Sequence, residues 1–465
     1  MSKFNIANLK KTIYYLKRNG LRDTYLAALE RLRKKTEDGY TYHPPSEAVL
    51  KTQKEQTLLN DDPLFSILVP AYRTKESYLC AMIESVLNQS YSRLEMIIAD
   101  ASGDMPGSSE KSVEEVVGQY KDDRIRYIKL AENKGISENT NAALFVASGE
   151  YIGLLDHDDL LTPDALFEIA EEIRRAKESG ITPRLLYSDE DKCDENGENY
   201  YEPHKKPDFN LDLILSNHYI CHFTVMQAEL MKKLGFRAAF DGAQDHDLVL
   251  RAVGEILGQK TFSDSAKGLS TEAEPEIRHI KKVLYHWRCH RGSTAENPAS
   301  KQYAYEAGGR AIADFLETQG ILAEVVPTKH LGFFKAEYKP DILTARADIG
   351  ILGGRLLGKG RKITGGIYDA SGVCPYEGLP EGFSGYMHRA ALMQDAYSVD
   401  IRLMKLRPEL TLIAEYILKA SGCERKEDLQ RLSDKECREL SIKICESIRN
   451  KGYRVVFNPG WTNKI

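Results

Sequence analysis

Long apolar runs are missing from this 465-residue sequence: none approaches the roughly 18 residues that a membrane-spanning helix needs. The first residues also lack the apolar segment of a secretory signal peptide. Neither sign of charge dominates, because 64 Lys and Arg face 69 Asp and Glu. We therefore expect a globular protein of two or three domains that neither crosses a membrane nor coats nucleic acid.

Paired cysteine motifs are absent as well. The eight cysteines lie far apart in the chain, and none forms a C-x-x-C pair. This spacing is typical neither of a zinc site nor of the disulfide framework of a small secreted domain. We expect reduced thiols in a cytosolic protein.

The glycine-rich motifs that bind phosphates are the third absence. Neither G-x-G-x-x-G nor G-x-x-x-x-G-K-[ST] follows any of the expected strands. If the chain binds a nucleotide, its phosphates must be neutralised in another way.

Positive charge is concentrated at the N-terminus. Residues 1–35 carry a net charge of +8, which leaves −13 for the remainder. Apolar residues recur there at helical spacings and are interrupted near Asn19-Gly20, which predicts two short amphipathic helices; these residues are Leu9, Ile13, Leu16, Leu21, Tyr25, Leu29 and Leu32. Such an arm either lies on an anionic membrane surface or packs on its own protein. Residues 36–62 are polar, contain Pro44-Pro45 and are predicted to be a linker.

Strands alternate with helices from residue 63 onward. Short apolar runs predict strands at 65–70, 94–99, 124–128, 151–155 and 185–188, with helical patterns between them. This alternation predicts an α/β fold with a Rossmann-like, mostly parallel sheet and helices on both faces. In such sheets, ligands bind beyond the carboxyl ends of the strands.

Acidic residues follow two of these strand ends. Asp100 follows the 94–99 strand, and Asp156-His157-Asp158-Asp159 follows the 151–155 strand. Two or three carboxylates can hold a divalent cation that bridges a diphosphate, which would replace a glycine cradle. The alternative is a solvated turn that only caps the next helix.

Two downstream segments carry further polar side chains. Asp245, in Gln244-Asp245-His246-Asp247-Leu248, precedes an apolar-periodic stretch and is placed either to accept a proton or only to cap a helix. Residues 285–294 hold two histidines, two arginines and hydroxyls, which suit a diphosphate and its metal. Each histidine taken alone is more often structural.

Seven segments together resemble a known family. In chain order they read FSILVPAYRT, IIADASGD, NKGISENTNAAL, GEYIGLLDHDD, YSDEDK, FDGAQDHDLVLR and VLYHWRCHRGSTA. This series is similar to that of family-2 glycosyltransferases, particularly bacterial surface-polysaccharide members, including rhamnosyltransferase-like proteins. The resemblance runs from Leu64 to about Leu316. It implies a GT-A fold, a UDP- or dTDP-linked sugar donor and inversion at the anomeric carbon.

The resemblance also implies roles for individual residues. Asp245 would be the catalytic base, and a Mg²⁺ or Mn²⁺ would be held by Asp158, Asp156 and His290. Asp189, Glu190 and Asp191 would lie near the sugar or acceptor. The chain departs from the usual pattern at Ala99-Asp100, where two adjacent acids are common, and at Gln244, where Glu is common. Donor binding would involve Pro70, Ala71, Tyr72, Asp100, Lys134, Gly135, Asn141, Asp156 and Asp158.

These observations predict a basic helical arm and linker at 1–62 and a GT-A catalytic domain at 63–334. Residues 335–465 lack a counterpart of the acidic segment and are predicted to be a degenerate glycosyltransferase-like module. The expected function is transfer of a sugar to a hydroxyl of a cell-surface polysaccharide or lipid-linked glycan, in the cytoplasm or at the inner face of the membrane. Two alternatives stay open: an inactive assembly scaffold of the same fold, and a sugar nucleotidyltransferase, which typically needs a glycine-rich loop that ILVPAYRT lacks.

Overall fold

The structure is a computed structural model that describes residues 6–34, 39–59, 62–103, 111–258, 274–290, 302–423 and 426–464. Strands and helices alternate in the first part of the chain. The strands are β1 (Phe65–Ala71), β2 (Leu94–Asp100), β3 (Ile125–Lys129), β4 (Tyr151–Leu154), β5 (Leu160–Leu161), β6 (Leu185–Cys193), β7 (Tyr200–His204), β8 (Thr224–Gln227) and β9 (Ile277–Arg288). The helices are α3 (Glu76–Leu87), α4 (Val113–Val117), α5 (Ile136–Val146), α6 (Ala165–Glu178), α7 (Leu211–Ile214), α8 (Ala228–Leu234), α9 (Gln244–Leu257) and α10 (Gln302–Thr318).

These strands form one nine-stranded sheet, called here the first sheet. Its order is β3-β2-β1-β4-β8-β6-β9-β5, with β7 beside β6. Strands β8, β7 and β5 run against the others, so the sheet is mostly parallel. The parallel strands β2, β1 and β4 are neighbours, and they therefore bring their carboxyl ends to one edge.

Helices cover both faces of the first sheet. Because successive residues of a strand point to opposite faces, Ile67 and Val69 of β1 pack into the cluster of α3, α4 and α6. Leu68, between them, packs into the cluster that contains α5, α9 and α10. Burial on both faces explains why the β1 sequence is continuously apolar. The predicted α/β fold class, with helices on both faces of a mostly parallel sheet, is confirmed.

The last part of the chain forms a second, smaller sheet. Before it, β10 (Ala323–Pro327) and β11 (Phe334–Tyr338) form a separate two-stranded sheet, whose Phe334 and Ala336 pack into the core of the first sheet, and α11 (Ile342–Ala345) follows. The second sheet has the order β13-β12-β18-β15, with β17 on β12. Its long strands, β12 (Ile349–Leu357) and β18 (Arg454–Lys464), run parallel. The remaining elements are β13 (Ile363–Gly365), β14 (Ile367–Tyr368), β15 (Gln394–Asp395), β16 (Ser398–Val399), β17 (Met404–Leu406), α12 (Thr411–Ala420) and α13 (Asp434–Arg449).

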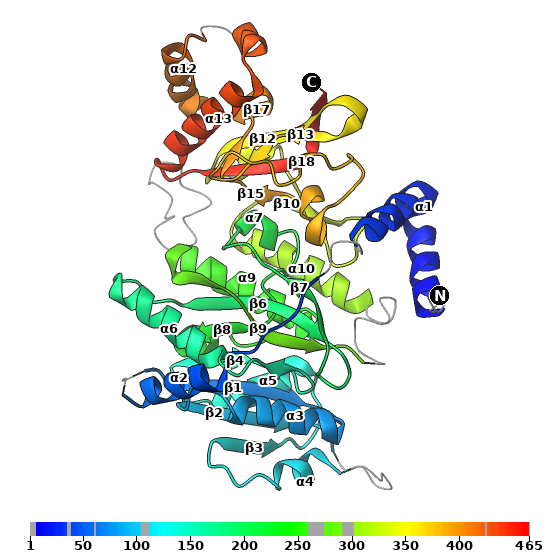
Figure 1. Cartoon of the computed structure of the whole chain (residues 1–465), viewed down its shortest axis with the longest axis vertical. Coiled ribbons are helices and arrows are strands. Elements are labelled where there is room, and N and C mark those ends of the chain that lie inside the picture. The colour runs from blue at the N-terminus through cyan, green and yellow to red at the C-terminus, as the bar shows by residue number, and fades with distance from the viewer. Residues whose placement is uncertain are drawn as a thin grey trace.

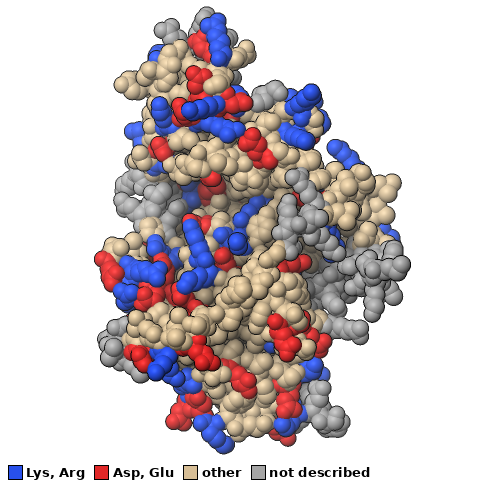
Figure 2. Space-filling model, in the orientation of Figure 1, with Lys and Arg blue, Asp and Glu red and all other residues tan. Residues whose placement is uncertain are grey.

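The two sheets lie in two lobes stacked along the long axis of the molecule, with β12 and β18 in the upper lobe of Figure 1. Glycine permits the close packing of the second sheet, because a Cβ on Gly353 would lie 2.2 Å from the Val399 Cβ. Lys, Arg, Asp and Glu are interspersed over both lobes on the face drawn in Figure 2. The domain limits and the degenerate nature of residues 335–465 stay predictions.

A buried arginine joins the two lobes. Arg346 donates to Asp348 at 2.6 Å and to both carboxylate oxygens of Asp212, in α7, at 3.3 Å. Beside it, the side-chain amide of Asn210 bonds both backbone groups of Asp395, at 3.0 and 2.9 Å. Paired polar groups therefore fix the position of the second lobe on the first.

The N-terminal arm is helical, as predicted. Helix α1 (Ile6–Lys34) is interrupted at Gly20, whose φ of 78° and ψ of 175° are not helical. Two helices therefore meet at the predicted break. Among the described residues, no helix combines the length and apolar character needed to cross a membrane.

The predicted linker, residues 36–62, contains a helix instead. Helix α2 (Glu47–Leu59) is rich in Leu, Lys, Gln and Glu, which are good helix formers. Gln53 and Thr57, one turn apart, are both buried. The linker prediction was wrong for this stretch because it took polar residues to be exposed. Gln53 and Thr57 are instead buried on one face of the helix.

One face of the arm packs on the rest of the protein. The carboxylate of Glu30 accepts hydrogen bonds from the backbone N–H groups of Ser384 and Gly385 and from the Ser384 hydroxyl. Asp23 pairs with Lys329 at 3.0 Å. The arm therefore packs on its own protein, as one of the two predicted alternatives states.

Candidate active site

Three parallel strand ends form the candidate site. Residues Ala71 and Asp100 are register partners at the ends of β1 and β2, and Asp156 follows β4 on the other side of β1. The sheet topology therefore brings the predicted donor residues after β1, β2 and β4 to one edge, as the strand order requires.

The acidic segment after β4 is not a solvated turn. Asp159 is buried and accepts hydrogen bonds from the Tyr285 hydroxyl at 2.6 Å and from the Arg288 backbone N–H at 2.7 Å. Burial, followed by the charges of Asp158 and Asp156, raises the pKa of Asp159 well above its usual value. Asp159 thus anchors the segment to β9 and leaves its neighbours to face the site.

Two groups of side chains at this edge could hold a divalent cation. The first is the predicted pair, because the His290 Nε2 lies 2.9 Å from the Asp158 Oδ2. The second joins Asp156 and Asp159 to His222, whose ligand atoms all lie within 4.8 Å of one another. Both groups supply the oxygen and imidazole ligands that bind such ions. Asp156 belongs to the second group rather than to the Asp158–His290 pair.

His222 was missed by the sequence analysis. Its ring stacks on Tyr285 with ring centroids 4.6 Å apart, and its backbone N–H donates to Glu190 at 3.2 Å. Burial disfavours its charged form, but Cys221 and the carboxylates of Glu190 and Asp156 outweigh burial and raise the pKa of His222 well above its usual value. His222 precedes β8, and only the antiparallel pairing of β8 with β4 brings it to Asp156. No sequence motif predicts the pairing of β8 with β4.

Asp245 lies in a narrow pocket that opens at this edge. The pocket is also lined by Pro70, Asp156 and His222. Asp245 is in the first turn of α9, but the N-cap is Ala243 and no side chain caps the helix, so capping is not its role. Burial and the nearby Asp156 carboxylate raise the pKa of Asp245 to about 6, against the opposing charge of His222. A carboxylate with this pKa can accept a proton near neutral pH.

The neighbours of Asp245 are structural. His246 stacks on His218 with ring centroids 4.9 Å apart and bonds the Ile214 carbonyl at 2.9 Å. Asp247 forms ion pairs with Arg237 and Arg251. Within this segment, only Asp245 places its carboxylate in the pocket.

The predicted donor residues around α5 support the pocket from outside. Gly135, with a φ of 96°, precedes α5, and a Cβ there would lie 2.3 Å from the Asp241 carboxylate. The Asn141 amide bonds both backbone groups of Phe236 at 2.9 Å. Lys134 is exposed and pairs with Glu132 at 3.2 Å. Asn141 therefore positions the chain before α9, and its role in donor binding stays a prediction.

Asp100 is buried in the protein, whereas Tyr72 is exposed at its surface. Asp100 is buried and accepts hydrogen bonds from the Tyr127 hydroxyl at 2.8 Å and from the Ser102 backbone at 2.9 Å. The Tyr72 ring is 42% exposed, with the Arg73 guanidinium 5.2 Å from its centroid. At this edge Tyr72 offers an open aromatic face, whereas Asp100 shapes the turn beneath it.

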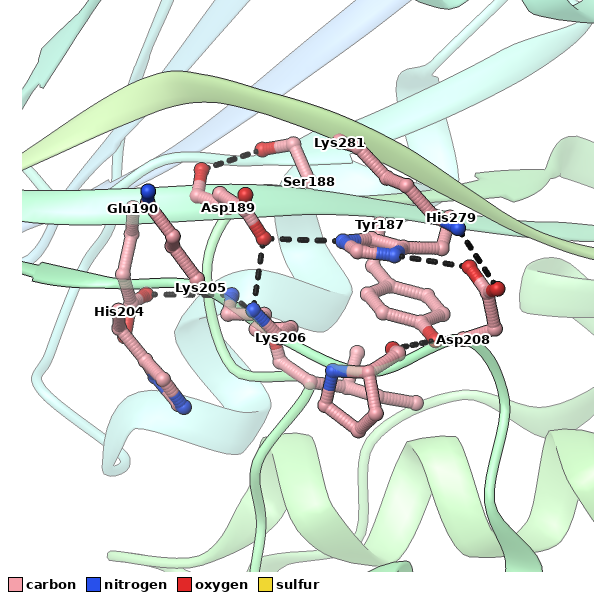
Figure 3. A network of polar contacts seen from close by, with 12 residues as sticks. Tyr187, Ser188, Asp189, Glu190, His204, Lys205, Lys206, Asp208, His279 and Lys281 are labelled. Carbon is pink, nitrogen blue, oxygen red and sulfur yellow. Dashed lines mark hydrogen bonds and ion pairs between the residues drawn. The ribbon is translucent and has the colours of Figure 1, made fainter. Parts of the chain in front are cut away.

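The acids of the YSDEDK segment lie on β6 and are all engaged. Figure 3 shows Asp189 pointing to His279, which it meets at 2.9 Å, and to the Lys206 backbone N–H, which donates to it at 2.8 Å. Asp191 bonds His286 and accepts from the Tyr40 hydroxyl at 2.7 Å. These two carboxylates hold the strand to its neighbours instead of pointing into the narrow pocket.

Glu190 is the member of this segment that adjoins the pocket. Its carboxylate contacts His204 at 3.1 Å, Lys206 at 3.4 Å and the His222 backbone N–H. Burial opposes its charge, but Lys206, the His204 hydrogen bond and His222 hold the pKa of Glu190 well below its usual range. Glu190 is therefore a carboxylate that positions His222 beside Asp156.

The chain is similar in sequence to known proteins. Residues 66–235 match the family model described as glycosyl transferase family 2. The O-antigen biosynthesis protein RfbC of Myxococcus xanthus is 31% identical over 278 residues, which are 60% of this chain and 20% of that protein. A protein of Escherichia coli K12 named as the colanic acid biosynthesis glycosyl transferase WcaA is 31% identical over 202 residues, which are 42% of this chain and 68% of that protein.

The chain spans about a fifth to a third of the length of several curated relatives that it matches. Among solved structures, residues 1–349 of S. aureus TarS in complex with UDP-GlcNAc align over 54% of this chain and 66% of that one. Their identity is 19% and the TM-score is 0.39.

Proposed function

This chain belongs to glycosyl transferase family 2, and on that premise we propose that it is an inverting transferase of sugars from a nucleotide-diphosphate donor. The acceptor is a hydroxyl of a growing cell-surface polysaccharide or lipid-linked glycan. The observation that carries the proposal is Asp245, a half-buried carboxylate with a raised pKa in a pocket shared with Asp156 and His222.

Asp245 acts as the general base. A sugar hydroxyl is a weak nucleophile at neutral pH, and a carboxylate within reach takes its proton as the new bond forms. Attack on the anomeric carbon from the side opposite the leaving nucleotide diphosphate inverts its configuration in one step. No residue of the chain then has to form a covalent intermediate with the sugar.

Asp158 and His290 would hold a Mg²⁺ or Mn²⁺ at the strand edge, and Asp156, with Asp159 and His222, is the alternative group for the ion. Such an ion stabilises the charge that develops on a departing diphosphate. The exposed Tyr72 ring would stack on the nucleotide base, and Gly135 lets α5 approach the segment before α9.

The arm adds a proposed contact with an anionic membrane at its cytoplasmic face. Leu21, Tyr25 and Leu32 lie on the helix face opposite Asp23 and Glu30, and they are 80%, 64% and 65% exposed. This exposed apolar stripe lies within a segment of net charge +8. Both features favour binding to anionic lipid headgroups, where a lipid-linked acceptor would be found.

A donor panel tests the proposed activity. UDP-, dTDP- and GDP-sugars are titrated into the protein by calorimetry in Mn²⁺ and in EDTA, and hydrolysis or transfer is followed by NMR. We expect one nucleotide class to bind in Mn²⁺ and the released or transferred sugar to have the opposite anomeric configuration to the donor. Asp123→Asn, which changes an exposed turn carboxylate, is the matched control and should behave as wild type.

The alternatives give different results in the same panel. Donor binding without hydrolysis or transfer to any acceptor would favour an inactive scaffold. Release of pyrophosphate from a nucleoside triphosphate and a sugar 1-phosphate would identify a nucleotidyltransferase. Retention of the anomeric configuration would overturn the single-step mechanism.

A further inference from the structure

Arg288, the last residue of β9, has a buried guanidinium without an ion pair. It is 2% exposed, and no carboxylate of the described residues pairs with its side chain. Arg346, which is also fully buried, lies instead between the carboxylates of Asp212 and Asp348. Burying a charge without a countercharge is unfavourable. A position that served packing alone would therefore favour an apolar side chain.

The guanidinium of Arg288 holds two main-chain carbonyls. Its Nε donates to the Asp158 carbonyl at 2.6 Å, and its Nη1 donates to the Glu195 carbonyl at 2.8 Å. Its Nη2 is buried and has no hydrogen-bond partner among the described residues. The rigid fork of donors spans two segments, the acidic segment after β4 and the turn that follows β6. Arg288 therefore ties these two segments together.

The backbone of Arg288 holds the next acid of the same segment. Its N–H donates to the Asp159 Oδ1 at 2.7 Å, while the Tyr285 hydroxyl donates to the other oxygen at 2.6 Å. Two consecutive residues of the acidic segment are thus fixed to β9. Because Nε takes the carbonyl of Asp158 and not its carboxylate, that carboxylate can meet His290, whose Nε2 lies 2.9 Å from its Oδ2.

The Tyr78 ring, from α3, lies against both Arg288 and His290. Its centroid is 5.1 Å from the Arg288 guanidinium carbon and 5.1 Å from the His290 ring centroid. The Tyr78 hydroxyl donates to the Glu195 Oε1 at 2.5 Å. Gly197 of the same turn comes so close that a Cβ there would lie 3.2 Å from the Arg288 Nη1. Contacts from α3 and from the turn therefore hold the guanidinium in place.

We propose that Arg288 is a positioning residue of the candidate cation site. By holding the main chain of Asp158, its guanidinium directs the Asp158 carboxylate toward His290 and so sets the affinity of this pair for a divalent cation. Replacing groups that orient metal ligands typically lowers metal affinity by about 10–100-fold. The inference rests on the proposed function, in which Asp158 and His290 hold the ion.

Binding of Mn²⁺ alone tests the proposal without turnover. Full-length wild type, Arg288→Met and Arg288→Lys are titrated with Mn²⁺, and the free ion is followed by electron paramagnetic resonance. Both variants should bind Mn²⁺ at least about tenfold more weakly than wild type. Lysine keeps the charge but lacks the fork that spans two carbonyls, so it should not restore the affinity. The lysine variant also keeps the test open where Arg288→Met does not fold.

Nucleoside diphosphates give a second measurement. UDP, dTDP and GDP are titrated by calorimetry in Mn²⁺ and in EDTA, and the one that wild type binds most tightly is used for the variants. Arg288→Lys should weaken its binding at least about tenfold in Mn²⁺ and leave binding in EDTA unchanged, because the guanidinium acts through a metal ligand. In Asp158→Asn, adding Arg288→Lys should cause no further loss in Mn²⁺, as expected for residues that act together.

Arg355 of the second lobe is the matched control. It is 6% exposed, and it donates to the carbonyls of Glu381 at 3.1 Å and of Ala390 at 2.6 Å. Like Arg288, it has one buried nitrogen, Nε, without a partner among the described residues. Arg355→Lys should lower the melting temperature about as much as Arg288→Lys does, but Mn²⁺ binding should stay as in wild type. This comparison separates lost stability from lost positioning of the cation ligand.

Three results would overturn the proposal. The first is an Mn²⁺ affinity of the Arg288 variants within about tenfold of wild type. The second is an equal loss of nucleoside diphosphate affinity in Mn²⁺ and in EDTA, which would make Arg288 a direct diphosphate contact. The third is an equal loss of Mn²⁺ affinity in Arg355→Lys, which would make the effect one of stability.

Failure of this inference and failure of the proposed function can be told apart. A wild type that binds no Mn²⁺ but transfers sugar would overturn the role of Arg288 and leave the transferase function standing. A wild type that binds Mn²⁺ but no nucleotide sugar would count against the proposed function, whereas the effect of the Arg288 variants on Mn²⁺ affinity would still decide the positioning role.

Discussion

Buried charges in the second lobe and charges at the edge of the first sheet have different partners. In the second lobe, Arg346 lies between two carboxylates, and Asp400 bonds both Arg402 and Tyr368. At the edge of the first sheet, and among the described residues, the Asp156 carboxylate has no hydrogen-bond partner and the Asp245 carboxylate accepts a hydrogen bond only from the amide of Gln244. Buried ion pairs are part of the fold, whereas carboxylates with few hydrogen bonds and perturbed pKa values in a pocket are candidates for a binding site.

Replacing the proposed base should give the largest effect. Asp245→Asn keeps the shape of the pocket but cannot accept a proton, so transfer should fall by about 10²–10⁴-fold while donor affinity is kept. Steady-state kinetics with calorimetry measure the two quantities, and Asp123→Asn is the control. Transfer within about tenfold of wild type, only ~1.4 kcal/mol of barrier, would remove Asp245 from this role.

The pH dependence of kcat/KM also tests the assignment of Asp245 as the general base. Because the pKa of Asp245 is raised to about 6, its base form disappears as the pH falls through that value. We expect kcat/KM to rise with pH, with an acid limb near 6, and to level off above it. A profile that stays flat from pH 5 to 8 would contradict the assignment, since a carboxyl with this pKa must titrate there.

A structural charge of the second lobe should affect stability instead. Arg346→Met leaves Asp212 and Asp348 buried without their partner, which should lower the free energy of unfolding by about 3–5 kcal/mol. Denaturant titration measures this, and Arg174→Met, which removes an exposed ion pair, should cost less than about 1 kcal/mol. Equal stability of the two variants would show that the buried ion pairs of Arg346 contribute no more than an exposed ion pair.

The two candidate cation groups can be told apart by their histidines. If Asp158 and His290 hold the ion, His290→Gln should weaken Mn²⁺-dependent donor binding by at least about tenfold, ~1.4 kcal/mol. His222→Gln should then have a smaller effect. The reverse order would assign the ion to Asp156, Asp159 and His222. Calorimetry in Mn²⁺ and in EDTA gives both comparisons.

Local pattern was enough to predict much of the fold and part of the site. The apolar runs of β1, β2 and β4 specify buried parallel strands, and their ends fix where Asp100 and Asp156 must lie. The break at Gly20 was likewise visible in the spacing of apolar residues. Each of these features depends on residues close together in the chain.

Contacts between distant segments were not predictable in the same way. His222 reaches Asp156 through an antiparallel strand pairing, and no local pattern specifies that register. Helix α2 looked like a linker because its polar residues Gln53 and Thr57 are buried only in the folded protein. The hydrogen bonds of the Asn141 amide with the Phe236 backbone, 95 residues away in the chain, were not predicted either.

The two faces of the arm helix should contribute differently to stability. Glu30 and Asp23 contact the protein, so Glu30→Gln should lower the free energy of unfolding by about 1 kcal/mol, or about 2 °C in melting temperature. The opposite face carries exposed Leu21 and Tyr25. Replacing both by Gln should leave stability within about 0.5 kcal/mol, because surface changes away from packed groups cost little.

Vesicle co-sedimentation then decides what the exposed face does. The Leu21→Gln, Tyr25→Gln double variant should bind anionic vesicles several-fold more weakly at low salt, whereas Glu30→Gln should bind them as wild type does. Added salt should weaken binding of both, because it screens the attraction between the basic arm and the headgroups. Equal sedimentation of the double variant and the wild type would remove the membrane contact. The arm would then act only by packing on its own protein through Glu30 and Asp23.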